Sequence, residues 1–195
     1  SKERYSDAAE SYRAFVAQHP THRLTPLLHV KLIEALQQAG FVRDALRARE
    51  GFTVAYGPGS AFWDHYGSDG APESAEFLKS YLSAANSRAH ARAQQSGKRR
   101  DYKAAIAGYR RYLDAFPQAS ESASINFLMA EALQDTGASG KALAEYERTA
   151  YGYPDHPRAA EAAYAAVLAY DQVAKLDSPQ DPLAWERQSL ISAER

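Results

Sequence analysis

The segment YRRYLDAFP at residues 109–117 decides the fold, because recast copies of it recur as YERTAYGYP at 146–154 and as YRAFVAQHP at 12–20. The segments at 109–117 and 146–154 lie 37 positions apart. A fixed period of this length indicates helical units that stack one on the next, with no single central core.

The same period divides the rest of the chain. Gly57, a helix stopper, follows Pro20 by 37 positions, whereas 60 positions separate Gly57 from Pro117, so one unit contains an insertion. Because the chain begins and ends within a repeat, we expect a fragment of a longer protein. The predicted segments are a half repeat at 1–20, a repeat at 21–57, an aromatic insertion loop at 58–71, a repeat with a long first helix at 72–117, a repeat at 118–154 and an incomplete repeat at 155–195.

Composition favours helices and excludes several kinds of site. The chain is 45% hydrophobic and has no cysteine, so we expect neither disulfides nor thiolate metal sites, and the redox compartment stays open. A net charge of −1 gives no general attraction to nucleic acid, which we do not expect as the main partner. No apolar stretch is long enough for a membrane span.

Helix ends are marked by capping residues and by glycine. Side chains that can cap the start of a helix precede the apolar runs, at Thr25 and at Ser120 or Ser122. Glycines that can adopt the left-handed conformation end the first helices of two units, at Gly40 and at Gly137 with Gly140.

The repeated positions resemble tetratricopeptide repeats over most of the chain apart from about 58–71. The matching residues are small ones at the hairpin crossing (Ala93, Ala130), glycine at the turn (Gly40, Gly137), alanine early in the second helix (Ala8, Ala45, Ala105, Ala142), an aromatic four residues later in most units, and the final proline. The resemblance implies an all-α, right-handed superhelical solenoid of antiparallel helix pairs.

The segments at 116–120 and 153–164 are most similar to longer-period repeats of bacterial envelope proteins, of the outer-membrane β-barrel assembly lipoprotein and Tol-Pal coordinator type. This resemblance implies a non-catalytic adaptor in the periplasm or at the outer membrane, and a cytoplasmic location stays open. It also implies a concave groove that holds a protein or peptide, lined by His90, Gln94, Phe127, Glu131, Gln134, Tyr164, Leu168 and Asp171. The alternative is that Phe127, Tyr164 and Leu168 form the core between repeats.

No arrangement of residues predicts catalysis, a cofactor or a metal. The histidines at 19, 22 and 29 have no accompanying carboxylate, and a Gly-x-Ser-x-Gly nucleophile motif is absent from the sequence. A polysaccharide-handling role would need two carboxylates facing one pocket, for which Glu131 with Asp171 is the remote candidate. We therefore expect a binding protein.

Aromatic residues gather in the insertion at 58–71. Phe62, Trp63 and Tyr66 lie close together in sequence, and aromatic side chains in loops are frequent anchors of interfaces. They define a second candidate partner site. The alternative is that the loop folds back and covers an exposed part of its own unit.

Positive charge is concentrated between residues 86 and 111. This basic band contains Arg88, Arg92, Lys98, Arg99, Arg100 and Lys103, followed by Arg110 and Arg111, against the single acid Asp101. It can bind an acidic protein, a lipid headgroup, an anionic glycan or a nucleic acid, or it can be an ordinary solvated surface. A regulatory or nucleic-acid-associated module that uses this band is the alternative function.

Overall fold

The structure is a computed structural model that describes residues 2–67, 72–153 and 156–177, and it confirms the all-α prediction for those ranges. Parts of four predicted segments lie outside the described residues: residue 1 of the half repeat, 68–71 of the insertion loop, 154 of the repeat at 118–154, and 155 with 178–195 of the last repeat. Helices are the only regular elements in the described ranges. They are α1 (Lys2–Gln18), α2 (Thr25–Gln38), α3 (Val42–Tyr56), α4 (Ala61–Tyr66), α5 (Pro72–Ser96), α6 (Arg99–Ala115), α7 (Ser122–Asp135), α8 (Ser139–Tyr151) and α9 (Ala159–Asp177).

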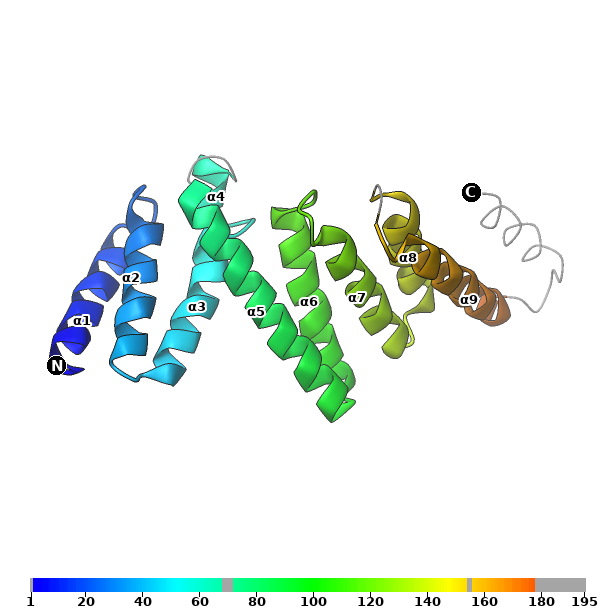
Figure 1. Cartoon of the computed structure of the whole chain (residues 1–195), viewed down its shortest axis with the longest axis horizontal. Helices are drawn as coiled ribbons and strands as arrows, with labels where there is room; N and C mark the ends of the chain where they lie inside the picture. The colour runs from blue at the N-terminus through cyan, green and yellow to red at the C-terminus, as the bar shows by residue number, and fades with distance from the viewer. Residues whose placement is uncertain (1, 68–71, 154–155, 178–195) are drawn as a thin grey trace. The chain divides into compact units, whose positions relative to one another are not determined.

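The chain divides into two compact units within α5, one ending at Ser87 and the other beginning at Arg88. In the N-terminal unit α2 packs against both α1 and α3, and α4 packs against α3 (Figure 1). In the C-terminal unit each of α6, α7 and α8 packs against the helix that follows it (Figure 1). The right-handed solenoid that the resemblance implies stays a prediction.

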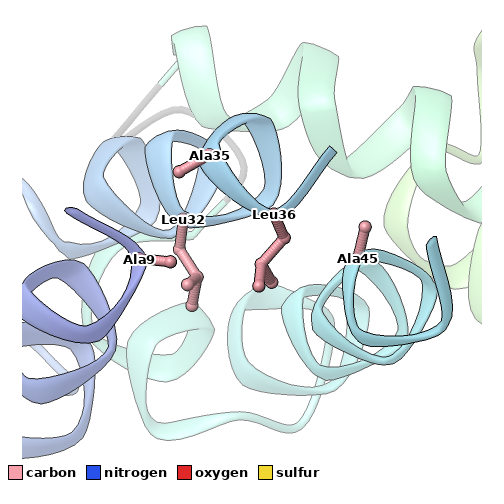
Figure 2. Packing of buried hydrophobic residues seen from close by; sticks show 5 residues of the cluster. All are labelled: Ala9, Leu32, Ala35, Leu36 and Ala45. Atoms are coloured by element: carbon pink, nitrogen blue, oxygen red, sulfur yellow. The ribbon is translucent and has the colours of Figure 1, made fainter. Parts of the chain in front are cut away.

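Three helices share one apolar cluster at the start of the N-terminal unit. Ala9 of α1 and Ala45 of α3 lie on either side of Leu32 and Leu36 of α2, and all four are at most 4% exposed (Figure 2). The alanines let α1 and α3 come close to α2, whose leucines fill the space between them. α2 is therefore the central helix of this cluster.

A second cluster in the same unit surrounds a histidine. His29 of α2 lies against the rings of Phe52 and Tyr56 of α3, and Tyr81 of α5 packs on Phe52. The Nδ1 atom of His29 is 3.2 Å from the Tyr56 hydroxyl. Burial lowers the pKa of His29 to about 4, against a weaker effect of its hydrogen bond with the backbone of Ala48. His29 is therefore a neutral core residue at pH 7, and its pKa makes this cluster sensitive to acid.

The predicted insertion loop contains a short helix that the sequence analysis missed. The Ser60 side chain accepts a hydrogen bond from the Trp63 backbone N–H and so caps α4, and Gly67 ends the helix with a φ of 65°. Six residues are too few for a helical periodicity to be recognised in a sequence. The segment from Ala61 to Tyr66 is thus a helix that packs on α3.

The core of the C-terminal unit combines aromatic and polar side chains. Tyr109 and Tyr112 of α6 are fully buried, as are Phe127 and Asn126 of α7. The Asn126 amide donates hydrogen bonds to the backbone carbonyl of Glu145 and to the Thr149 hydroxyl of α8, at 2.7 and 3.0 Å. These bonds fix α7 against α8 where an apolar side chain would allow the helices to slide.

Thr25 and Ser122 do not cap their helices as predicted, and neither does Ser120, whose hydroxyl donates to the Glu121 side chain. Thr25 and Ser122 are each the first residue of a helix, and each hydroxyl donates back to the carbonyl of the residue six positions earlier, His19 and Phe116. The N-cap positions themselves, Leu24 and Glu121, make no side-chain capping bond. Since Thr25 and Ser122 are 97 positions apart, the same device closes the loop before α2 and before α7.

Glycine ends α2 and α7 in the same way. Gly40 and Gly137, also 97 positions apart, have φ values of 78° and 73°, as predicted for left-handed residues after a helix. The backbone N–H of the next residue then bonds to the carbonyl of Leu36 or Leu133. The prediction for Gly140 is wrong, because this residue lies in the first turn of α8, where the chain has already resumed a helix.

Because His29 is buried and neutral, we expect the N-terminal unit to lose stability in acid. The folded pKa of about 4 lies below the ordinary value of 6.5, so the unfolded chain takes up a proton first as the pH falls. The contribution of neutral His29 to the free energy of unfolding is complete above pH 6.5 and is lost progressively as the pH falls toward 4. Between pH 7 and pH 5 we expect a loss of about 2 kcal/mol in the free energy of unfolding.

Denaturant unfolding followed by circular dichroism at the two pH values measures this loss. A His29→Leu variant removes the titrating group, and its free energy of unfolding should change less between the two pH values than that of the wild type. An equal change in both proteins would contradict the assignment.

Candidate functional site

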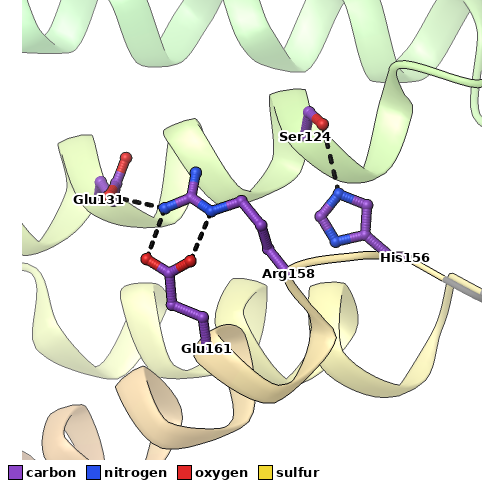
Figure 3. A network of polar contacts seen from close by, with 5 residues as sticks. All are labelled: Ser124, Glu131, His156, Arg158 and Glu161. Atoms are coloured by element: carbon purple, nitrogen blue, oxygen red, sulfur yellow. Dashed lines mark hydrogen bonds and ion pairs between the residues drawn. The ribbon is translucent and has the colours of Figure 1, made fainter.

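Arg158, just before α9, is the centre of a polar network in the C-terminal unit. Its Nε and Nη2 atoms donate to the two carboxylate oxygens of Glu161 at 2.6 Å each, and Nη2 lies 3.8 Å from Oε1 of Glu131 on α7 (Figure 3). Its guanidinium carbon is 3.8 Å from the centroid of the Phe127 ring. One side chain thus joins the start of α9 to two successive turns of α7.

This contact explains where Phe127 lies. Phe127 is 2% exposed, because Arg158 covers one side of its ring and Tyr146 of α8 packs on it with centroids 5.5 Å apart. Tyr164 occupies the corresponding position 37 residues later and is 65% exposed. Phe127 is therefore core, as the alternative interpretation has it, while Tyr164 lies on the surface.

The carboxyl group of Glu131 is half-buried among charged and aromatic neighbours. Burial raises the pKa of Glu131, and the Arg158 guanidinium opposes this rise. Burial, with the negative charges of Glu131 and Asp135, raises the pKa of Tyr146 to about 12. The tyrosine hydroxyl stays protonated at pH 7. The network has two carboxylates, Glu131 and Glu161, against the single cation Arg158, so it offers a ligand acceptors of hydrogen bonds.

Other predicted groove residues contact partners of their own. His90 Nδ1 is 2.7 Å from the Tyr109 hydroxyl, the Gln134 amide donates to the Gln172 side chain, and Asp171 accepts from Lys175 at 2.6 Å. Gln94 and Leu168 are exposed. The structure thus brings Phe127 and Glu131 together around Arg158, Gln134 contacts α9 separately, and the Asp171 carboxylate is engaged on its own helix.

Arg158 and His156 were missed as site residues by the sequence analysis. The His156 Nε2 atom is 3.3 Å from the Ser124 hydroxyl, so the segment before α9 has two contacts with α7 (Figure 3). The spacing of three between Arg158 and Glu161 is a recognisable helical ion pair. The contacts with α7 leave no such signal, because they join residues more than 25 positions apart.

The aromatic residues of α4 lie mostly against their own unit. Phe62 is 4% exposed and packs between Tyr56 and Tyr66, with ring centroids 5.2 and 4.7 Å away. A cavity of about 10 Å³, room for about one water molecule, remains between α4 and the start of α5. Trp63 and Tyr66 are half-buried, so they are the members of this trio with surface to offer a partner.

The N-terminal unit contains a cleft of about 520 Å³ that the sequence analysis did not anticipate. Buried Leu32 and Leu36 of α2 line it, together with Arg13 of α1 and the ion pair of Asp44 and Arg47 on α3. Its size is that of a ligand pocket, but its lining comes from three helices whose periodicity predicts only that they pack.

All six residues assigned to the basic band are exposed. They lie on the second half of α5, in the turn that follows and on the first turns of α6. The acid within the band, Asp101, accepts a hydrogen bond from Ser96 at 2.6 Å and lies 3.6 Å from Arg100. One of the cations thus has a nearby acid.

Comparisons with protein-family models, with curated proteins and with solved structures found no match for this chain. Across residues 2–67, 72–153 and 156–177, histidine and acidic side chains form no group of three or more that could bind a metal. In the same ranges the helices are too short or too polar to span a membrane.

Replacing Arg158 tests the centre of the network. Arg158→Ala removes the cover of Phe127 and the cation opposite Glu131, and we expect a loss of about 1–2 kcal/mol in the free energy of unfolding. Lys175→Ala is the control, because it breaks an exposed ion pair within α9 and should change the free energy of unfolding little. Equal unfolding midpoints for the two variants in denaturant would show that Arg158 does not pin α9 to α7.

Proposed function

We propose that this chain is a non-catalytic protein–protein interaction scaffold whose partner binds the face of the C-terminal unit formed by α7 and α9. The observation that carries the proposal is the exposure of Tyr164 and Leu168, which are one helical turn apart on α9 and 65% and 48% exposed. Large apolar side chains that share a helix face and remain exposed are typical of interaction surfaces.

The opposite face of α9 is already occupied. Ala162, Ala166 and Ala169 are at least 99% buried, and α9 packs against α8. Because the small side chains are used for packing within the unit, the large ones are left for another surface. Phe127, at the position equivalent to Tyr164, is covered by Arg158, which precedes α9, the second helix after α7. A partner that binds α9 would cover Tyr164 in the same manner.

The polar network gives this face specificity. Glu161 is on the same face of α9 as Tyr164 and Leu168, being three and seven positions before them, and Arg158 joins it to Glu131. Interfaces commonly combine a few apolar anchors with a charged or polar surround. The partner therefore needs an apolar segment together with groups that hydrogen-bond to carboxylates.

We further propose that the helix pairs belong to a tetratricopeptide-type solenoid in a bacterial cell-envelope assembly. Supporting the solenoid are the loop device of Thr25 and Ser122 and the glycine ends at Gly40 and Gly137, both repeated at 97 positions. Supporting the envelope location is the similarity of the segments at 116–120 and 153–164 to envelope repeats. The periplasm and the outer membrane are the places to test first.

The test is cross-linking in intact cells with the full-length protein. A Tyr164→Ala, Leu168→Ala variant should lose at least ten-fold of the captured partner, because it removes both apolar anchors. The control is Val42→Ala, Val54→Ala, since these valines are each 66% exposed on α3. Unchanged capture by the first variant would refute the α9 surface, and a partner confined to the cytoplasm would refute the envelope location.

A further inference from the structure

The solvent face of α6 carries an unusual charge pattern. Seven residues of this helix are buried: Ala105, Ile106, Gly108, Tyr109, Tyr112, Leu113 and Ala115. At 100° per residue they occupy one side of the helix, and the cations occupy the other. These five cations, the α6 stripe, are Arg99, Arg100, Lys103, Arg110 and Arg111, all of which are exposed.

The α6 stripe is straight, because it follows one rigid helix. It covers an arc of about 120° and a length of about 18 Å along the axis. The acid on this face of α6 is Asp114, which lies beyond the last cation of the stripe. The other acid of the helix, Asp101, is mostly buried, with 12% of its side chain exposed. Within the described ranges Arg100 is the stripe residue that has an ion pair, at 3.6 Å.

Four of the five cations are arginines. The planar guanidinium donates two parallel hydrogen bonds to a phosphate, which makes arginine suited to phosphate recognition. The stripe residues one turn apart, Arg99 and Lys103, are separated by about 6 Å along the axis. Such a series of cations complements a linear polymer with closely spaced phosphates.

The neutral residues on the same face indicate which polymer fits. Ala104 and Ala107 are exposed between the cations, so a bulky ligand can approach the helix closely. The aromatic side chain next to the stripe, Tyr102, is half-buried and hydrogen-bonds to Asp135 of α7, so none lies among the cations for an unpaired base to stack on. This face also has no large apolar side chain of the kind that amphipathic helices insert into a bilayer. These features favour the backbone of a duplex over single strands and membranes.

We propose that the α6 stripe binds the phosphate backbone of duplex nucleic acid without sequence preference. The surface is independent of the Tyr164 and Leu168 face, so the two binding surfaces can fail separately. Duplex binding requires a compartment that contains nucleic acid, so this proposal competes with the envelope location and not with the α9 surface. Binding through about five phosphates makes log K fall with log salt concentration with a slope of about −4.

The experiment is a fluorescence anisotropy titration of two labelled 20-base-pair duplexes of unrelated sequence, between 25 and 150 mM NaCl. We expect equal affinities for the two duplexes and the slope given above. The triple variant Arg99→Ala, Lys103→Ala, Arg110→Ala should reduce the magnitude of the slope by about three, one for each lost phosphate contact. Circular dichroism verifies that the variants keep their helix content.

The matched control is Arg4→Ala, Arg23→Ala, Arg43→Ala, which removes the same charge from exposed positions of the N-terminal unit. This control should keep the slope within one unit of the wild-type value. Equal slopes for both triple variants, or no binding at 25 mM NaCl, would overturn the proposal. So would tighter binding to anionic phospholipid vesicles or to polyglutamate than to the duplexes, since that would assign the stripe to a membrane or an acidic protein.

Discussion

The structure depends on one constraint, which is that a short amphipathic helix must cover its apolar face with a helix next to it in sequence. In the N-terminal unit α2 buries Leu32 and Leu36 between alanines of α1 and α3. In the C-terminal unit α7 contributes Phe127 and Asn126, and side chains of α8 and from the start of α9 cover them. Local packing of this kind leaves the outer faces of the helices available, and both proposed binding surfaces lie on such faces.

Much of this arrangement was predictable because it depends on short-range patterns. Gly40 and Gly137 end their helices as expected, since a left-handed residue after a helix strongly favours glycine. The predicted capping roles of Thr25 and Ser122 were wrong, because a hydroxyl at the start of a helix can bond to the preceding loop as well as to the helix. α4 was missed because six residues show no period.

The candidate site was predictable only in part, because burial depends on which distant residue covers a side chain. Phe127 and Tyr164 occupy equivalent positions in the sequence pattern, yet Arg158 buries the first and the second is exposed. The periodicity places each of them on the equivalent face of its own helix. It does not tell which other residue packs over the side chain. Likewise the charges of the α6 stripe are visible in the sequence, whereas their alignment opposite the buried tyrosines required the bounds of the helix.

The central claim is that stability is local, so a defect in one group of helices should not reach another. Hydrogen–deuterium exchange of a Leu36→Ala variant tests this most directly, with Val54→Ala as the exposed control. Loss of a buried leucine costs about 2–5 kcal/mol, which is enough to accelerate exchange measurably. The account predicts faster exchange in α1, α2 and α3 with α7, α8 and α9 unchanged. An equal acceleration in both sets of helices would show a single cooperative core and would contradict it.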